Sequence, residues 1–439
     1  MPALHMNKQE RIILFLLASL NFTHIMDFMI MMPLGNFLMP HFNITAQQFS
    51  FLVAAYTFSA AGSSLTAASF VDRFDRKKVL LFAYIGFLVG TFFCAVAPTY
   101  GLLLSARIFS GIFGGLIGAQ VLSIVADLIP FERRGAAMGI VMASFSAASV
   151  FGVPFGLYLS EYFSWHAPFF FVVALGMIVM PLLVRFIPNM ADHLHDKNRK
   201  RVNTIELLKG IVTDNKQRLA IMLTATMMMG HFLVIPFLNP FMELNVGFTT
   251  KQTPLIYFVG GALTLFTSPI IGRIADKIGK FRLFTIMIIV AVVPIALITN
   301  MPRIPFYFVL CITGFWFVVS TGRAIPAQAI VSEVVPPARR GGFMNINSSI
   351  QQFAVGLASV IAGIIVVKTP ENTIKNYDVT GYLSIAVILC CLLIAYYLRK
   401  AMGIKLLPLR KHRPTIRGNA IQPLDLEQEE LNSETAKEN

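Results

Sequence analysis

The chain has 439 residues, of which 56% are hydrophobic and 13% are charged. Soluble globular proteins carry about 25% charged residues, so this composition indicates that lipid surrounds much of the folded chain. The four cysteines lie in apolar runs, which excludes a secreted disulfide scaffold. The net charge of +14 is compatible with nucleic-acid binding, so the positions of the charges along the chain decide between the two readings.

Twelve apolar segments are long enough to cross about 30 Å of hydrocarbon as helices. They are 12–34, 49–70, 79–97, 102–129, 136–160, 168–186, 219–241, 254–274, 283–300, 306–335, 342–367 and 381–398. We therefore predict an all-α membrane protein with twelve transmembrane helices in two pseudo-symmetric six-helix bundles. An even number of helices places both ends of the chain on the same side of the membrane.

The basic residues are strongly biased to that same side. Of the 36 lysines and arginines, 30 fall at the chain ends, in the loops on that side or in the last turn of a helix that borders them, and four fall in the opposite loops. By the positive-inside rule, both termini are expected in the cytoplasm and the chain in the cytoplasmic (inner) membrane. The basic residues form short loop clusters that face anionic lipid, so we expect the lipid bilayer and not nucleic acid as a partner. The first apolar segment is too long for a cleaved signal peptide and is expected to be an anchor.

A long hydrophilic stretch divides the chain into two halves. The predicted parts are an N-terminal bundle (1–187), a cytoplasmic linker (188–218), a C-terminal bundle (219–400) and a largely disordered cytoplasmic tail (401–439). A shift of 204 positions places Asp72 on Asp276 and Thr45 on Thr249, and later in the halves the shift becomes 206. Such repeats indicate duplication, and they predict a cavity between the bundles near the middle of the membrane.

The repeated loops carry a recognisable motif. The segment Gly272-Arg-Ile-Ala-Asp276-Lys277-Ile-Gly279-Lys280, after the eighth helix, resembles the loop signature of the major facilitator superfamily. The first copy has Ala68 and Asp75 where that family has glycine, and Asp tolerates left-handed backbone well enough to keep the turn. The resemblance implies a conformational gate formed by Asp72, Arg73, Arg76, Gly272, Asp276, Lys277 and Gly279. Ordinary positive charge in the loops is the alternative.

Two further motifs resemble the twelve-helix drug:proton antiporter and sugar-efflux branch of that family. One is Arg107-x-x-x-Gly111 in the fourth helix, and the other is Gly152-Val-Pro154-Phe-Gly156 in the fifth, where the proline predicts a hinge or a tight seal in the gate. Asp27 resembles the acidic position in the first helix of bacterial sugar and drug exporters. The resemblance implies proton-coupled efflux, with Arg107 associated with the coupling.

Ionisable side chains deep in a helix need a partner or a water-filled cavity, because a charge at the bilayer centre costs about 2.5–3.5 kcal/mol. Asp27 is expected about mid-helix, with His24 one turn away on the same face. It is predicted to carry the proton or a cation. The alternative is a fixed ion pair, for example with Arg107, that only holds helices together. Arg107 keeps its charge permanently, so it tunes the proton affinity of Asp27 or hydrogen-bonds carbonyls at a helix break.

His231 is the repeat counterpart of Asp27, 204 positions later. Imidazole changes charge near physiological pH, so His231 is predicted to couple to Asp27 or to contact substrate; a neutral core histidine is the alternative. Arg323, with Trp316 two turns before it, is predicted to line the substrate cavity as an anchor for anionic or acceptor groups. Alternatively, Arg323 stabilises a kink caused by Pro326.

The eleventh predicted helix carries a stripe of small and polar residues. Its end nearest the linker side contains Asn345 and Gln352, which we predict to hydrogen-bond substrate in the cavity. Gly356 and Gly363, further along, are expected to support close helix packing.

Several motifs are absent from the sequence. It contains no phosphate-binding loop, no His-Glu-x-x-His motif and no Cys/His metal spacing, so no cofactor, no metal and no enzymatic activity are expected. We predict a proton-coupled secondary active transporter that exports a small amphipathic molecule by alternating access. The alternative is a proton-coupled importer, or a transporter of lipid-like molecules, with the same fold. Protons and a small-molecule substrate are the expected partners, and the chain is expected to act as a monomer. The sign of the substrate's charge stays open, because the buried arginines suit anions and Asp27 suits cations.

Overall fold

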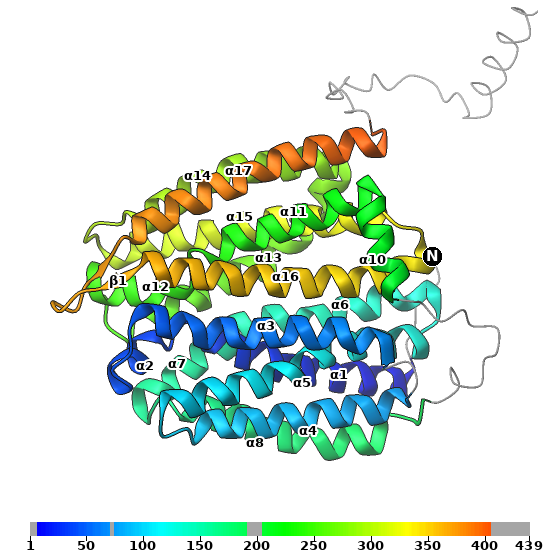
Figure 1. The fold of residues 1–439 in the computed structure, drawn as a ribbon, viewed down its shortest axis with the longest axis horizontal. Coiled ribbons are helices and arrows are strands. Elements are labelled where there is room, and N and C mark those ends of the chain that lie inside the picture. The colour runs from blue at the N-terminus through cyan, green and yellow to red at the C-terminus, as the bar shows by residue number, and fades with distance from the viewer. Residues whose placement is uncertain (1–6, 71–73, 191–203, 405–439) are drawn as a thin grey trace, which may run out of the picture. The chain divides into compact units, whose positions relative to one another are not determined.

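The computed structural model of this chain describes residues 7–70, 74–190 and 204–404 (Figure 1). Two predicted gate residues, Asp72 and Arg73, and nearly all of the predicted tail lie outside these ranges. Long helices run roughly side by side along the horizontal direction of Figure 1. The described helix ends that border the basic loops lie at the end where α1 begins, which we call the basic end; the other end is the opposite end.

The first half of the chain is helical almost throughout. Its elements are α1 (Lys8–Ile30), α2 (Gly35–His41), α3 (Ala46–Phe70), α4 (Arg76–Ala95), α5 (Tyr100–Leu128), α6 (Phe131–Ala147), the π-helical segment η2 (Ala148–Gly152), α7 (Val153–Tyr162) and α8 (Ala167–Phe186). The elements α6, η2 and α7 follow one another without a break and correspond to the predicted fifth helix.

The second half repeats this plan. Its elements are α10 (Thr204–Thr213), α11 (Asn215–Phe232), α12 (Ile235–Phe241), the π-helical segment η3 (Met242–Val246), α13 (Thr253–Ile278), α14 (Lys280–Thr299), α15 (Phe306–Glu333), α16 (Pro337–Ile365), the strands β1 (Val367–Lys368) and β2 (Ile374–Lys375), and α17 (Tyr377–Met402). The two strands form a small antiparallel hairpin in the loop between α16 and α17. α10 lies inside the segment predicted as a linker.

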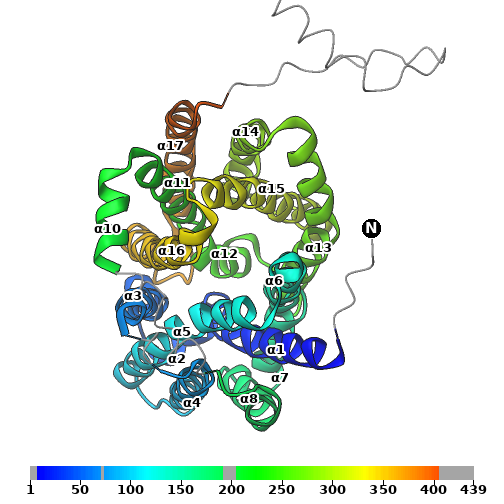
Figure 2. The ribbon, with the colours of Figure 1, turned by 90° about the vertical axis from the view of Figure 1, so that its right-hand side faces the viewer.

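The predicted fold class is confirmed. Eleven helices within the described ranges are long and apolar enough to cross a membrane. α3 is equally long but contains many alanines and serines, and it packs against α5 and α16, so it completes a set of twelve. Seen from the basic end, α1 to α8 form one group of helices and α10 to α17 form the other (Figure 2).

The first and seventh predicted helices are broken in the structure, at equivalent places. A turn separates α1 from α2 around Pro33, and another separates α11 from α12 just before Pro236. Proline has no N–H to continue the hydrogen-bond ladder, which explains why each helix ends there. The continuous helices predicted over 12–34 and 219–241 are therefore corrected to two helical pieces each.

The duplication is also visible in the helix caps. Thr45 and Gln48 exchange backbone-to-side-chain hydrogen bonds of 2.9 and 3.2 Å before α3, and Thr249 N–H donates to Gln252 at 3.0 Å before α13. These contacts satisfy backbone N–H groups that have no partner at a helix start. Pro130 and Pro336 cap α6 and α16 with nearly the same backbone angles, φ −53° and −56°.

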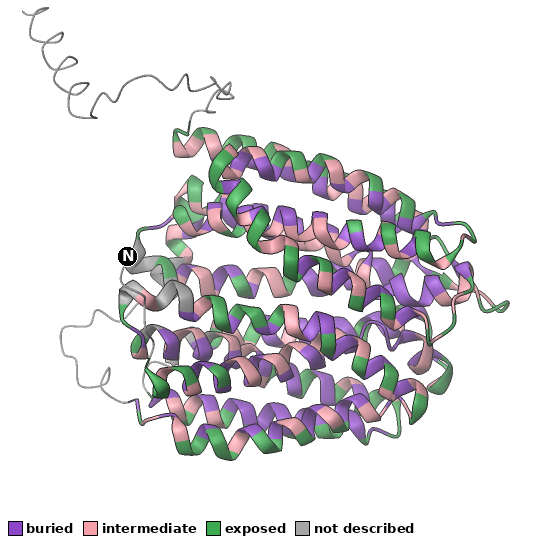
Figure 3. Ribbon diagram, turned by 180° about the vertical axis from the view of Figure 1, so that it is seen from behind, coloured by how far each residue is buried: buried purple, intermediate pink, exposed green. Residues whose placement is uncertain are grey.

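The outward faces of the helices are apolar. Large hydrophobic side chains such as Phe15, Phe163 and Phe266 have 69%, 75% and 73% of their surface exposed. Figure 3 shows exposed positions distributed along the outward faces of the helices, with buried positions on the inward faces. Exposed apolar surface of this extent marks contact with an apolar partner, which for twelve such helices is the lipid bilayer.

Candidate functional site

A fully buried ion pair lies in the first half. The carboxylate Oδ2 of Asp27, on α1, accepts a hydrogen bond of 2.8 Å from Nη1 of Arg107, on α5, and both side chains are completely inaccessible. Thr91 on α4 donates a second hydrogen bond to Asp27, at 3.2 Å. Asp27 therefore ties three helices together. It lies three residues before the end of α1 rather than mid-helix as predicted, because α1 ends at Ile30.

Aromatic rings separate this ion pair from the second half. The guanidinium of Arg107 lies 4.4 Å from the ring centre of Tyr56, on α3, and Phe28 stacks on Tyr56 at 5.7 Å between ring centres. Phe28 in turn contacts Phe232 of α11 at 6.0 Å. The pair is thus enclosed within its own bundle, directly behind the rings that meet the other bundle.

The Arg107-x-x-x-Gly111 motif has a packing reason. A Cβ atom at Gly111 would collide with the backbone of Tyr56, so only glycine lets α3 come this close to α5. This close approach is what brings the Tyr56 ring over Arg107. The arginine and the glycine of the motif therefore serve the same local arrangement.

His24 faces the same aromatic wall but does not bond to Asp27. Its ring lies 5.6 Å from Phe87 and 6.2 Å from Tyr56. Neither ring nitrogen has a hydrogen-bond partner in the parts of the chain that the structure describes. The predicted neighbourhood of His24 and Asp27 on α1 is present, without a direct contact between the two side chains.

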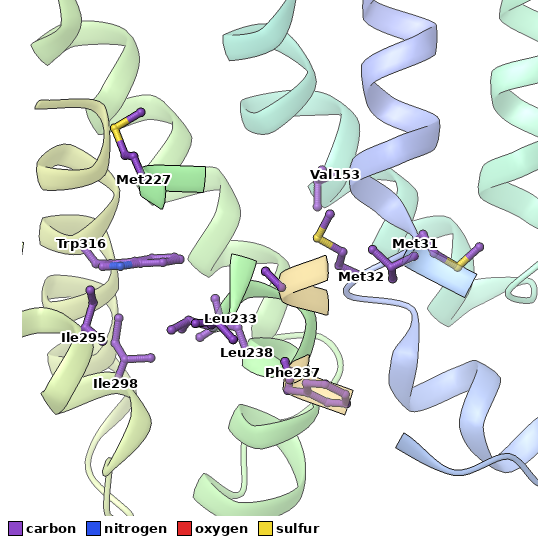
Figure 4. Packing of buried hydrophobic residues seen from close by; sticks show 14 of the residues in the cluster. Met31, Met32, Val153, Met227, Leu233, Phe237, Leu238, Ile295, Ile298 and Trp316 are labelled. Carbon is purple, nitrogen blue, oxygen red and sulfur yellow. The ribbon is translucent and has the colours of Figure 1, made fainter. Parts of the chain in front are cut away.

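The second half holds a different polar centre. Nη2 of Arg323, on α15, donates to Nδ1 of His231, on α11, at 3.0 Å, and the His231 ring lies 5.1 Å from that of Trp316. Arg323 makes no ion pair within residues 7–70, 74–190 and 204–404. Figure 4 shows the indole of Trp316 reaching from α15 toward the segment that carries Met227 and Leu233.

Two sequence-based alternatives can now be compared with the geometry. Asp27 pairs with Arg107 and not with His231, although Asp27 and His231 occupy equivalent positions. The residues that follow them, Phe28 and Phe232, are also repeat counterparts, and these two rings meet across the interface. For Arg323, α15 runs on through Pro326, and no bond from Arg323 to a backbone carbonyl occurs among the described residues. The alternative that Arg323 stabilises a kink at Pro326 is therefore not supported by a hydrogen bond to the backbone.

The predicted glycines of the fifth helix pack within the first half. Added Cβ atoms at Gly152 and Gly156 would meet Met26 and Ile30 of α1. Pro154 stands at the start of α7, directly after the π-helical segment η2. The close approach between the halves at this place comes instead from Gly261 of α13, where a Cβ would lie 3.0 Å from the backbone of Val150.

On the other side of the interface, α3 and α16 form a long contact between the halves. Cβ atoms added at Gly356 and Gly363 would clash with Thr57 and Ser50 of α3. The predicted close packing at these two glycines is confirmed.

Among the loop residues predicted as a gate, Arg76 makes an ion pair within its own half. Nε of Arg76 pairs with Asp127 at 2.6 Å, linking α4 to α5. Asp276 and Lys277 are exposed in the last turn of α13, and space around Gly272 is open. Neighbouring Lys280 pairs with Glu333 of α15.

The two copies of this turn differ in backbone. Gly279 has the positive φ of 94° that favours glycine, whereas Asp75 has φ −57°. Instead of a left-handed turn, Asp75 caps α4, and its carboxylate accepts hydrogen bonds from the N–H groups of Lys77 (2.8 Å) and Met190 (3.2 Å). The expectation that Asp75 preserves the turn is wrong, because the capping bonds favour ordinary backbone.

Asn345 and Gln352 are half-buried on α16, and no hydrogen bond joins either of them to Arg323 or Trp316 among the described residues. Asn347 is the residue that reaches α11, where its Oδ1 accepts from Thr224 at 2.6 Å. Sequence spacing alone did not distinguish these neighbouring asparagines.

A polar cluster at the opposite end was missed by the sequence analysis. Glu243 of η3 accepts hydrogen bonds from Asn36 of α2 (2.5 Å) and from Thr253 (2.7 Å), and Asn239 donates to the carbonyl of Pro33 (2.9 Å). The bonds of Asn36 with Glu243 and of Asn239 with Pro33 join the two halves. Glu243 could have been found as the lone acidic residue within the apolar stretch 219–275.

Comparisons with known proteins agree with this architecture. A family model described as Major Facilitator Superfamily matches residues 17–325. The uncharacterized MFS-type transporter YceJ of Bacillus subtilis (strain 168) is 25% identical over 83% of this chain and 90% of the relative. Multidrug resistance protein 2 of the same organism is 23% identical over 82% and 86%.

Solved structures have the same fold. A bacterial homologue of the human lysosomal transporter Spinster, inward-facing and unoccupied, superposes with a TM-score of 0.73 at 15% identity, covering 90% of this chain and 98% of that one. A D-xylose–proton symporter superposes with a TM-score of 0.71 at 16% identity, covering 89% and 97%.

Proposed function

This chain belongs to the major facilitator superfamily and is a multi-pass membrane transporter rather than an enzyme, and from that premise we propose that it is a proton-coupled secondary active transporter that exports a small amphipathic molecule by alternating access. Asp27 carries the proton, and Arg107 tunes the proton affinity of Asp27. His24 and His231 also take part in the proton coupling. The observation that carries the proposal is the buried pair of Asp27 and Arg107.

The chemistry of the pair supports proton coupling. A proton on the Asp27 carboxylate removes its negative charge, so the attraction that holds the 2.8 Å bond weakens and the guanidinium becomes available to another acceptor. Two guanidinium nitrogens of Arg107, Nε and Nη2, already lack hydrogen-bond partners in the described residues. Tyr56 and Phe28 lie between the ion pair and Phe232. A movement of Arg107 therefore displaces aromatic side chains at the interface of the halves.

The contacts between the halves support alternating access. The bundles 1–187 and 219–400 rock as units, connected by the segment 188–218, with both termini in the cytoplasm and the chain in the inner membrane. The Glu243 cluster closes the opposite end in this state. At the basic end, the described ion pairs of Arg76 with Asp127 and of Lys280 with Glu333 each join two helices of a single half. We propose Arg323, Trp316, Asn345 and Gln352 as lining of the substrate path, and a monomer as the working unit.

The names of relatives favour export. Two of them are multidrug resistance proteins 2 and 3 of Bacillus subtilis. The proton gradient supplies enough energy for it, because one proton moving through 100 mV yields about 2.3 kcal/mol.

The experiment is proton movement in reconstituted vesicles. Thermal-shift measurements with ethidium, chloramphenicol, D-xylose and lysophosphatidylcholine first identify a compound that stabilises the protein. Adding that compound to proteoliposomes with an entrapped pH dye should then drive proton movement. Asp27→Asn should abolish it while still binding the compound. Glu371→Gln, which removes an exposed loop carboxylate, is the matched control and should behave as wild type. Coupling that survives in Asp27→Asn rejects this role for Asp27.

An importer or a transporter of lipid-like molecules is the second candidate. A pocket of about 370 Å³ between η2–α7 and α13 favours the lipid-like form, since apolar side chains line it together with Glu161 and Lys251. The direction of flux under an imposed pH gradient distinguishes import from export. Stabilisation by lysophosphatidylcholine alone would favour the lipid-like substrate.

A further inference from the structure

Arg323 is buried in the second half and pairs with no carboxylate among the described residues, and we propose that Arg323, together with Trp316 and Ser320, binds an anionic group on the transported molecule. The ligand class is an organic anion: a carboxylate, sulfonate or phosphate attached to an apolar body. The inference rests on the proposed transport function and adds the sign of the cargo's charge, which the sequence left open.

The state of the guanidinium carries the argument. Arg323 is only 2% exposed, its Nη2 is bonded to His231, and its Nη1 has no hydrogen-bond partner among the described residues. A guanidinium can only donate, so Nδ1 of His231 accepts, and this imidazole supplies no negative charge. A buried cation that lacks a counter-charge is unfavourable, and an incoming anion removes that penalty.

The surrounding groups are donors as well. Ser320 and Trp316 precede Arg323 by three and seven residues, so all three lie on one face of α15. Long side chains on a helix lean toward its N-terminus, which directs Arg323 back toward the other two. Trp316 Nε1 and Ser320 Oγ are buried and also without partners within the described ranges. Three unpartnered groups that can all donate form a receptor for an acceptor-rich ligand.

The site also fits the apolar part of such a ligand. The His231 ring lies against Trp316 and is bonded to Arg323, so the cationic and aromatic groups adjoin the same imidazole. Met227 and Leu233 lie on the segment that faces Trp316 (Figure 4). Aromatic and methionine side chains supply adaptable apolar contact beside the charged anchor.

A cationic cargo does not suit this place. It would bring a second positive charge next to Arg323, whose own charge is not offset by a negative charge among the described residues. The carboxylate of Asp27 is already engaged by Arg107 and Thr91 and is enclosed behind Tyr56, so it does not offset Arg323.

The chain offers a direct reporter for the test, because it has two tryptophans and one of them is at the site. The variant Trp165→Phe leaves Trp316 as the sole tryptophan, in full-length protein in nanodiscs of phosphatidylcholine. Benzoate, benzamide and benzylamine are titrated while the emission is recorded. Benzoate should change the emission saturably and bind at least about tenfold more tightly than benzamide, since hydrogen bonds to an ionised acceptor are about twice as strong as neutral ones. Benzylamine should bind more weakly still.

A second pair of ligands separates the possible sources of the anion. Phenyl phosphate and lysophosphatidic acid carry the same phosphate monoester on a ring and on an acyl chain. Binding of phenyl phosphate supports a small soluble anion, and binding of lysophosphatidic acid alone supports an anionic lipid headgroup. Either result supports the anion site.

Variants identify the residue responsible. Arg323→Gln should lose the preference for benzoate over benzamide, and Arg323→Lys should keep part of it, because lysine retains the charge without the planar donor pair. Arg303→Gln, which removes an exposed arginine, is the matched control and should bind as wild type. Ser320→Ala, a smaller change, should weaken benzoate binding even if Arg323→Gln fails to fold.

The proposal is overturned if none of the anions binds, or if benzylamine binds as tightly as benzoate. It is also overturned if Arg323→Gln folds and binds benzoate as wild type does. If Arg323→Gln does not fold, unchanged benzoate binding in Ser320→Ala overturns the proposal instead. The assay needs no gradient, so its result is independent of coupling. If benzoate binding depends on Arg323 while vesicles show no proton movement, the proposed function fails and the anion site stands. If the vesicles show proton movement with cationic compounds only, the anion site fails and the proposed function stands.

Discussion

The two halves of this transporter each bury an arginine on corresponding helices, but only the first half supplies a carboxylate for it. Arg107 is neutralised by Asp27, whereas Arg323 has the neutral acceptor His231 at the repeat position of that aspartate. The duplicated scaffold was kept, as the matching helix breaks and caps show. The difference teaches that the halves diverged at their centre, one toward an internal ion pair and the other toward an arginine bonded to a neutral imidazole.

The packing beside the Arg107-x-x-x-Gly111 motif also differs between the two halves. In the first half, Tyr56 of α3 lies against Gly111 of α5; at the counterpart positions of the second half, Gly260 of α13 lies against Phe317 of α15. The large and small residues have exchanged helices. As a result, Arg107 has an aromatic ring over it, and the second half has a glycine where that ring would be.

The largest effect should come from separating the first pair. Arg107→Gln leaves Asp27 buried without a counter-charge, so we expect the protein to lose about 3–5 kcal/mol of stability. Arg323→Gln removes a charge that has no ion-pair partner among the described residues, and it should change stability by less than about 1 kcal/mol or raise it. Thermal unfolding of both variants in the same detergent makes the comparison. Equal losses would show that the two arginines are not in different states.

A smaller loss is expected from filling the contact at Gly111. Gly111→Ala forces α3 and α5 apart and should cost about 1–3 kcal/mol, because an added methyl in a tight contact must displace backbone. The matched control is Gly118→Ala on the same helix, where a Cβ meets nothing within 4 Å. That variant should be neutral or slightly stabilising. Equal thermal shifts for both alanines would contradict the packing account of the motif.

The smallest effect is expected from a substitution that makes the centre of the second half resemble that of the first. In His231→Asp, a carboxylate oxygen takes the place of Nδ1, the same number of bonds from Cα, and pairs with Arg323. Benzoate binding measured through Trp316 should fall about tenfold, because the new carboxylate competes for the guanidinium. His231→Asn, an uncharged acceptor of the same size, is the control and should retain binding. Undiminished binding in His231→Asp would mean that the anion does not use Arg323.

Much of the fold followed from the sequence, and so did some of the site. Apolar runs and the repeat of Asp72 on Asp276 predict twelve helices in two halves, because segment length and charge bias are set by the bilayer. The pairing of Asp27 with Arg107 was foreseen as an alternative, since a buried charge requires a partner.

Other features depend on contacts between distant segments. Asn347 rather than Asn345 reaches α11 because side-chain direction on a helix changes by about 100° per residue, and the sequence does not show where the neighbouring helix lies. Asp75 adopts a cap rather than a left-handed turn because the N–H of Met190, more than a hundred residues away, completes its bonds. Glu243 was missed because its partner Asn36 belongs to the other half.

The contact between Phe28 and Phe232 has a mechanical meaning. A residue touches its own duplicate only where the axis relating the duplicates passes, so this ring pair marks that axis within the molecule. When two rigid bodies tilt against each other about a pivot, points near the pivot travel least and points at the far tips travel most. In the rocking motion that we propose, the ring pair would act as such a pivot if the halves stay in contact there. A small displacement beside Asp27 would then accompany a larger displacement at the loops.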